Sequence, residues 1–221
     1  MAGLATASWF LDEIREQLAE RLEQATGQPV CSLSIFPYGD SLRHPYRQFR
    51  EIRRDTLRRR SWQRSIGGRR AAEEISRHSR SDNRLLVGHS GGGVAALHAA
   101  QLLVRAEERC RQYWIVQIGS PRCPVPSYLR DKTLYLYSVD KTGKAKDPIC
   151  KLGSWGGWER TRYGVWRWNS SLYAPATILP LQMVGGHPDY FRSHLLNAAG
   201  QSNLELVLVA ITDWLTRSMS S

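Results

Sequence analysis

Apolar residues along the chain gather in short blocks, and longer amphipathic or polar segments separate these blocks. Five blocks predict strands: residues 30–36, 84–89, 113–119, 133–139 and 176–186. Pro180 lies inside the last block, where it indicates an edge strand or a bulge. The other strands are near-continuous apolar runs, a pattern typical of a parallel sheet that is covered on both faces.

Helical spacing of apolar residues accounts for most of the remaining chain. It predicts helices over residues 8–25, 46–60, 70–79, 92–112, 189–199 and 202–218. Ser202 and Glu205 form a capping-box pattern at the start of the last helix. Because strands and helices alternate, we expect an α/β protein with a mostly parallel sheet and helices on both faces. Residues 1–221 show no linker-like segment and no repeat, so we expect a single compact domain.

The composition excludes several classes of protein. The chain has 221 residues, of which 42% are hydrophobic, so it is expected to fold around one sizeable core. No apolar run is long enough for a transmembrane helix, and the acidic N-terminal segment does not resemble a signal peptide, so a cytoplasmic location is expected. The four cysteines are scattered. They indicate no disulfide framework, no metal site and no cofactor, and we expect them to be buried free thiols.

Positive charge is concentrated in one region. The net charge is +11, and 14 of the 26 arginines lie between Arg43 and Arg84. One interpretation is contact with phosphate groups, an anionic substrate or a membrane surface. The other interpretation is an exposed helical face in an arginine-biased protein, and the low lysine content favours it. Nucleic-acid binding is therefore not the favoured prediction.

The segment RLLVGHSGGG contains the strongest chemical signal. A predicted strand ends at His89, a predicted helix begins at Gly92, and Ser90 lies between them in a G-x-S-x-G pattern. Small residues on both sides allow the sharp turn that exposes the hydroxyl group of a nucleophilic serine. The same turn directs the Gly91 N–H at the N-terminus of the helix toward a developing oxyanion. Ser90 is therefore the predicted nucleophile.

A serine nucleophile needs a base, and three histidines follow Ser90 in the chain. His98 lies two turns into the predicted helix, where it points away from Ser90. His194 falls inside another predicted helix, where a structural role is expected. His187 follows the last predicted strand in MVGGHPDYF and therefore belongs on a loop at the carboxyl edge of the sheet. We predict His187 as the base.

The acid that orients the base is either Asp140 or Asp147. Asp140 directly follows the predicted strand 133–139, which is a common position for the acid. Asp147 follows after a short excursion, and Pro148 restricts its loop. The second oxyanion donor beside Gly91 is expected from residues 36–41, where the amide of Tyr38 or Gly39 is the candidate and the Ser41 hydroxyl is a further donor.

A tryptophan-rich segment lies between the candidate acid and base. Residues 154–173 contain four tryptophans and are expected to form either a lid or pocket wall, with Trp155 and Trp158 contacting substrate, or a packed extension of the core.

Taken together, GHSGGG around Ser90, the following IGSPRCPVP, and the Asp-Pro pair before a late histidine resemble the lipase class 3 branch of the α/β-hydrolases. The resemblance covers residues 84–190 and implies the α/β-hydrolase fold, with Ser90 as nucleophile, Asp147 as acid and His187 as base. It favours Asp147 over Asp140.

The expected activity is hydrolysis of carboxylic esters, including lipid or anionic esters, through an acyl-enzyme without a cofactor. An amidase, thioesterase or acyltransferase would use the same residues. The competing hypothesis is a basic protein that binds nucleic acid or a membrane surface through residues 43–84 on a hydrolase scaffold; the oligomeric state does not follow from the sequence.

Overall fold

The computed structural model describes residues 1–4, 8–40, 42–57, 62–78, 83–106 and 112–219. Its centre is a four-stranded sheet in the order β1-β2-β3-β6, in which every neighbouring pair is parallel. The strands are β1 (Asn83–His89), β2 (Gln112–Ile118), β3 (Thr133–Val139) and β6 (Thr177–Gln182). The predicted parallel sheet is thus confirmed, and Pro180 lies in an edge strand, where a missing N–H is tolerated.

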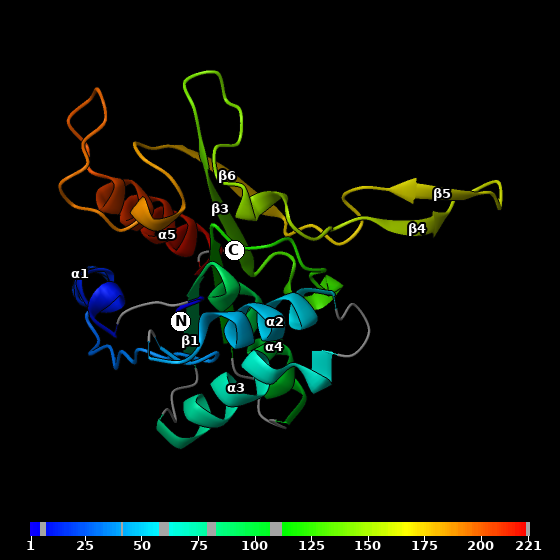
Figure 1. The fold of residues 1–221 in the computed structure, drawn as a ribbon, viewed down its shortest axis with the longest axis horizontal. Coiled ribbons are helices and arrows are strands. Elements are labelled where there is room, and N and C mark those ends of the chain that lie inside the picture. The colour runs from blue at the N-terminus through cyan, green and yellow to red at the C-terminus, as the bar shows by residue number, and fades with distance from the viewer. Residues whose placement is uncertain (5–7, 41, 58–61, 79–82, 107–111, 220–221) are drawn as a thin grey trace.

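Helices cover both faces of the sheet, as Figure 1 shows. On one face, α1 (Asp12–Thr26) and α5 (Asn203–Met219) bury apolar side chains against Val116, Ile118 and Leu136. On the other face, α3 (Ile66–His78) and α4 (Gly91–Ala106) pack against Leu86 and Ile115. The helix α2 (Pro45–Leu57) lies over the start of α4. The chain is therefore an α/β protein, and the alternation of side chains along each strand provides a core on each face.

Two predicted elements are absent. Residues 30–36 form no strand, although Ile35 accepts a hydrogen bond from the amide of Ala2. The free edge of β1 is instead contacted by Met1, which hydrogen-bonds to the Val87 carbonyl at 2.6 Å and to the His89 amide at 3.0 Å. Met1 therefore occupies the hydrogen-bonding positions that a fifth strand would need, a pairing between residues too distant in sequence for local patterns to reveal.

The predicted helix 189–199 is also wrong. The chain forms a 3-10 helix at His187–Asp189 and then continues in turns up to α5. Asn197 accepts backbone hydrogen bonds from Ala199 and Gln201, which closes a turn, and Leu196 is exposed. Polar local hydrogen bonds thus replace the helical ladder where no apolar face needs to be buried.

A two-stranded hairpin projects from the body of the molecule. Its strands are β4 (Gly157–Arg160) and β5 (Trp166–Asn169), which pair antiparallel and extend away from the main sheet in Figure 1. The hairpin lies within the tryptophan-rich segment 154–173, for which the sequence leaves open a lid or pocket wall and a packed extension of the core.

Two further expectations concern cysteines and membrane spans. Cys123 and Cys150 are buried free thiols as expected, but Cys31 is exposed, and Cys110 lies outside the described residues. Cys31 is exposed because the residues around it form an irregular surface segment rather than the predicted strand. Within the described part of the chain, no helix combines the length and apolar character needed to cross a bilayer.

Candidate functional site

Ser90 lies on a strained turn between the end of β1 and the start of α4. Its φ of 56° is the only positive φ of a non-glycine residue in the described chain. A Cβ at Gly88 would lie 2.3 Å from the Gly92 carbonyl oxygen, and one at Gly93 would lie 1.9 Å from Ser120 Oγ. These close approaches explain why glycines surround the serine, and they include Gly93, for which the sequence indicates no role. Strain of this kind collects at functional sites.

Neighbouring strands hold the turn in place. The amide of Ser90 donates to the Ile118 carbonyl at 2.9 Å, and Ser120 Oγ donates to the Ser90 carbonyl at 2.8 Å. Because β1 and β2 are parallel, both residues lie at the carboxyl edge of the sheet, where ligands of α/β proteins commonly bind. The position of Ser90 is thus fixed by the sheet rather than by a loop.

Gly3 lies against Ser90 and Gly91, the predicted nucleophile and the predicted first oxyanion donor. A Cβ on Gly3 would lie 2.7 Å from Ser90 Cβ, 3.0 Å from Ser90 Oγ and 2.8 Å from the Gly91 nitrogen. The side chain of Tyr38, whose amide is an expected second donor, packs with Ile52 and Ala95 in a small buried cluster. The Gly39 amide donates to the Phe36 carbonyl, and Ser41 lies outside the described residues. The backbone found beside Ser90 is therefore that of Gly3, because Met1 pairs with β1 and directs the chain toward the turn.

Asp147 and His187 form a close pair. The Nδ1 atom of His187 lies 2.7 Å from Asp147 Oδ2, and the carboxylate has no solvent exposure. Tyr190 Oη donates to the same carboxylate oxygen at 3.0 Å, and the Ile149 amide donates to Oδ1 at 2.8 Å. Tyr190 Oη also accepts a hydrogen bond from the Ser138 amide at the end of β3. Asp147 is therefore held by its own loop and by the segment 187–190, and Tyr190 joins that segment to the end of β3.

These contacts determine the charge state of Asp147. Burial by itself would raise the pKa of this carboxyl group, but the hydrogen bond and positive charge of His187, with smaller contributions from Ile149 and Tyr190, bring the pKa below its ordinary value. Asp147 is thus an ionised carboxylate in a buried position, able to fix a ring tautomer and to stabilise an imidazolium.

The alternative acid Asp140 is not near this pair. It is half-buried at the start of the turn 140–144, where its Oδ1 accepts hydrogen bonds from the Thr142 amide and hydroxyl and from the Lys144 amide. Those bonds lower the pKa of Asp140, with the Thr142 hydroxyl as the largest cause. Asp140 therefore stabilises its own turn, and the structure joins His187 to Asp147 instead.

His89 lies between the serine turn and His187. Its ring stacks on the ring of His187 at a centroid distance of 4.7 Å, and its Nε2 lies 3.1 Å from the His187 carbonyl oxygen. Burial, together with the charge of His187, lowers the pKa of His89 to about 3, so its ring is neutral and Nε2–H is the donor. Among the described residues, no hydrogen bond joins Ser90 Oγ to His187. The connection between them runs through His89, which precedes Ser90 in the chain and contacts His187 by stacking and by its hydrogen bond.

Sequence reasoning missed three residues of this site. Gly3 carries no local signal, because only the tertiary fold brings it to Ser90. Tyr190 follows His187 within HPDYF, but a tyrosine after a loop histidine is not specific. His89 directly precedes Ser90, the candidate nucleophile, and only 5% of its surface is exposed. A histidine at the buried end of a strand was the signal that the sequence offered.

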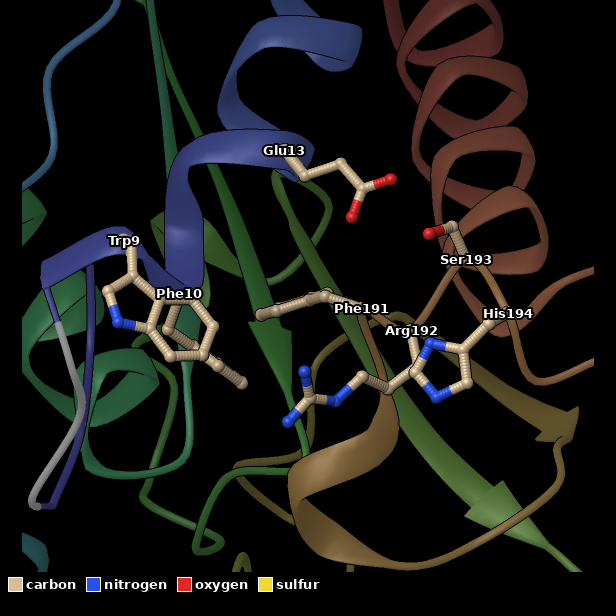
Figure 2. Close-up of a pocket in the computed structure, with 7 residues that line it drawn as sticks. All are labelled: Trp9, Phe10, Glu13, Phe191, Arg192, Ser193 and His194. Carbon is tan, nitrogen blue, oxygen red and sulfur yellow. The ribbon is translucent and has the colours of Figure 1, made fainter.

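The other candidate residues lie elsewhere. Trp155 is buried with Tyr135 and Cys150 and does not reach an open surface. Trp158 is exposed on the projecting hairpin, and His98 is buried in α4. His194 lines a small pocket of about 80 Å³ with Trp9 and Phe10 from the 3-10 helix Ser8–Leu11 that precedes α1, as Figure 2 shows.

A larger cavity of about 700 Å³ reaches the site from one side. It lies between α1, residues 28–35 and the edge of β1, and its walls include Ile14 and Leu18 of α1 and Leu11 just before it. At its inner end it is bounded by His89 and Met1, the neighbours of the serine turn. Its size and largely apolar walls are typical of cavities that bind small molecules.

The described site thus consists of a strained serine, a buried acid and histidine pair, and a stacked neutral histidine, all at one edge of a parallel sheet. Comparisons of the chain with protein-family models, with curated protein sequences and with solved structures gave no match.

Proposed function

We propose that this protein is a serine hydrolase of the α/β-hydrolase fold, resembling lipase class 3, that cleaves carboxylic esters. The observation that carries the proposal is the 2.7 Å contact between buried Asp147 and His187 at the sheet edge where Ser90 occupies a left-handed turn. A structural serine would not require this backbone strain, and a structural carboxylate at this depth would be costly without a charged partner.

In the proposed reaction, Ser90 Oγ attacks the ester carbonyl carbon while Nε2 of His187 takes the hydroxyl proton. Asp147 holds the Nδ1–H of His187 and stabilises the imidazolium that forms. The imidazolium then protonates the alkoxide leaving group as the carbon–oxygen bond breaks, leaving an acyl-serine. A water molecule, deprotonated by His187, attacks this ester, and the acid product leaves as Ser90 recovers its proton.

The oxyanion formed in both steps needs hydrogen-bond donors. The Gly91 amide lies at the N-terminus of α4, so the helix dipole supports a negative charge there. The backbone of Gly3 lies against the same atom, and we propose its amide as the second donor. His89 supports the base through its hydrogen bond to the His187 carbonyl.

His187 moves toward Ser90 Oγ when substrate binds, since hydrogen bonds of catalytic groups often form only in the substrate complex. Because Nδ1 of His187 hydrogen-bonds to the Asp147 carboxylate, Nε2 is the ring nitrogen that can accept the proton of Ser90.

We propose that the acyl group of the substrate is apolar. The cavity beside His89 supports this assignment, because its walls of aliphatic side chains from α1 and β1 would bury a hydrocarbon chain. The exposed arginines of α2 favour an ester with an anionic group.

The decisive experiment is labelling with a fluorophosphonate probe. The wild-type protein should be labelled at Ser90, Ser90→Ala should not be labelled, and His187→Ala should react far more slowly. Ser154→Ala removes an exposed serine on another loop and serves as the matched control. Absence of labelling in a folded wild-type protein, or equal labelling of Ser90→Ala, would overturn the proposal.

A further inference from the structure

The hairpin formed by β4 and β5 has one aromatic face and one polar face. Its register pairs Trp158 with Trp168 and Arg160 with Trp166, so these four side chains lie on one face. Glu159 and Arg167 form an ion pair on the opposite face. The hairpin is therefore amphipathic in the manner of a strand pair that packs against another surface.

No part of the described molecule covers the aromatic face. The exposed fractions of Trp158, Trp166 and Trp168 are 61%, 65% and 47%, and Tyr163 and Val165 at the tip are exposed by 81% and 63%. Exposed aromatic area of this size on a projecting arm marks an interaction surface rather than ordinary surface variation.

The charge around the arm is strongly positive. Residues 151–169 contain four basic residues and one acid, and Arg162 lies 5.2 Å from the Tyr163 ring at the tip. The base of the arm touches α2, since a Cβ on Gly153 would lie 3.1 Å from Thr56. On α2, four arginines are exposed: Arg47, Arg50, Arg53 and Arg54. Exposed apolar or aromatic side chains lie among them, namely Tyr46, Phe49 and Leu57.

We propose that the protein docks on bilayers that contain anionic phospholipids, with the tryptophan face of the hairpin inserted at the headgroup level. Indole and phenol rings favour this interface because one part of the ring is apolar and another forms hydrogen bonds. The arginines of the arm and of α2 then lie near the phosphates, where each basic residue adds to the attraction.

Aliphatic side chains distinguish this partner from a nucleic acid. Val165 at the tip and Leu57 on α2 are exposed among the arginines, and neither stacks on bases nor binds phosphate. Trp158 and Trp168 also meet edge to face, with an interplanar angle of 74°, so they do not present two parallel platforms for successive bases.

Vesicle co-sedimentation in the Ser90→Ala background tests docking without hydrolysis, so its outcome does not depend on the proposed activity. Vesicles with equal amounts of phosphatidylglycerol and phosphatidylcholine should bind the protein, and pure phosphatidylcholine vesicles should bind it much less. Trp166→Ala should weaken binding roughly tenfold, because a large apolar side chain no longer leaves water. Trp9→Ala is the matched control, since Trp9 is similarly exposed in the 3-10 helix Ser8–Leu11 before α1, away from the arm.

Two further variants separate charge from insertion. Arg162→Gln should reduce binding to the anionic vesicles and its dependence on salt, whereas Arg105→Gln at the end of α4 should not. The proposal is overturned if the protein does not bind anionic vesicles, or if Trp166→Ala binds them as tightly as the wild type. It is also overturned if the protein binds single-stranded RNA and does not bind the vesicles. Concentration-dependent dimerisation that is lost in Trp166→Ala, without vesicle binding, would assign the face to a second copy instead.

Discussion

The ring of His89 stacks on the ring of His187 with an interplanar angle of 24°, and Nε2 of His89 donates to the backbone carbonyl of His187 at 3.1 Å. The residue before the candidate nucleophile therefore positions the candidate base. It does so as a neutral ring, since burial lowers the pKa of His89 to about 3.

This pairing predicts a dependence of stability on pH. The folded-state pKa of His89 lies below the unfolded value of about 6.5, so the unfolded state binds a proton that the folded state excludes. The contribution of neutral His89 to the free energy of unfolding is complete above about pH 6.5 and is lost as the pH falls toward about 3. Between about pH 6.5 and 5 the loss is about 2 kcal/mol of unfolding free energy. Urea unfolding of wild type and His89→Gln measures it, because glutamine keeps a donor but does not titrate; a constant difference between the two proteins would contradict the prediction.

Asp147 and Asp140 should differ sharply in activity. Asp147→Asn should lower kcat on a p-nitrophenyl ester by about 10⁴, the order seen when a triad acid becomes an amide and the histidine takes the wrong tautomer. Asp140→Asn should retain activity, because Asp140 contacts only its own turn. If Asp140→Asn abolished turnover and Asp147→Asn did not, the pair of Asp147 and His187 would not be the catalytic acid and base.

Tyr190 should act as a positioning residue. Tyr190→Phe removes a donor to Asp147 and the acceptor for the Ser138 amide, which should cost about 1–3 kcal/mol of stability. The pKa of Asp147 should rise, kcat should fall about tenfold and KM should change little. Tyr163→Phe, on an exposed ring, is the control, and an unchanged kcat in Tyr190→Phe would limit Tyr190 to a structural role.

Gly3 should tolerate no side chain. An added Cβ meets Ser90 Cβ at 2.7 Å and the Gly91 nitrogen at 2.8 Å, so it crowds both the nucleophile and the oxyanion position. Gly3→Ala should lower kcat/KM and the rate of fluorophosphonate labelling by more than about tenfold, and Gly3→Val should lower them further. Circular dichroism checks the fold, and full labelling of folded Gly3→Val would place the oxyanion site elsewhere.

The cavity beside His89 should set acyl-chain preference. Leu18 of α1 lines this cavity, so Leu18→Phe should reduce its volume and shift the best substrate toward shorter acyl chains. Glu16→Phe adds the same ring to the exposed side of α1 and should leave the preference unchanged. A series of p-nitrophenyl esters of increasing length measures kcat/KM for both variants, and identical profiles would show that the acyl group binds outside the cavity.

Much of the fold follows from local patterns. Apolar runs predict β1, β2 and β3 because these strands are largely buried in the sheet, and β6 because its apolar positions cover the half-buried face of an edge strand. The glycines around Ser90 predict the turn because only small residues fit there. Of the three histidines after Ser90, the sequence favours His187 as the candidate base because it directly follows the last predicted strand. The carboxyl ends of parallel strands meet at one edge of the sheet, so this position brings His187 to the edge where Ser90 lies.

The tertiary structure alone decides the remaining contacts. Asp140 and Asp147 are the same residue type, and the sequence favours Asp147 only through a family resemblance. The path of the loop after β3 brings Asp147 to His187 and leaves Asp140 half-buried in its own turn. Gly3 reaches Ser90 through the hydrogen bonds of Met1 to the edge of β1, across more than 80 residues of sequence. Such contacts depend on backbone pairing and burial between distant segments, which the periodicity of side chains does not encode. The strained turn at Ser90 depends on neighbouring residues alone, so the sequence predicts it.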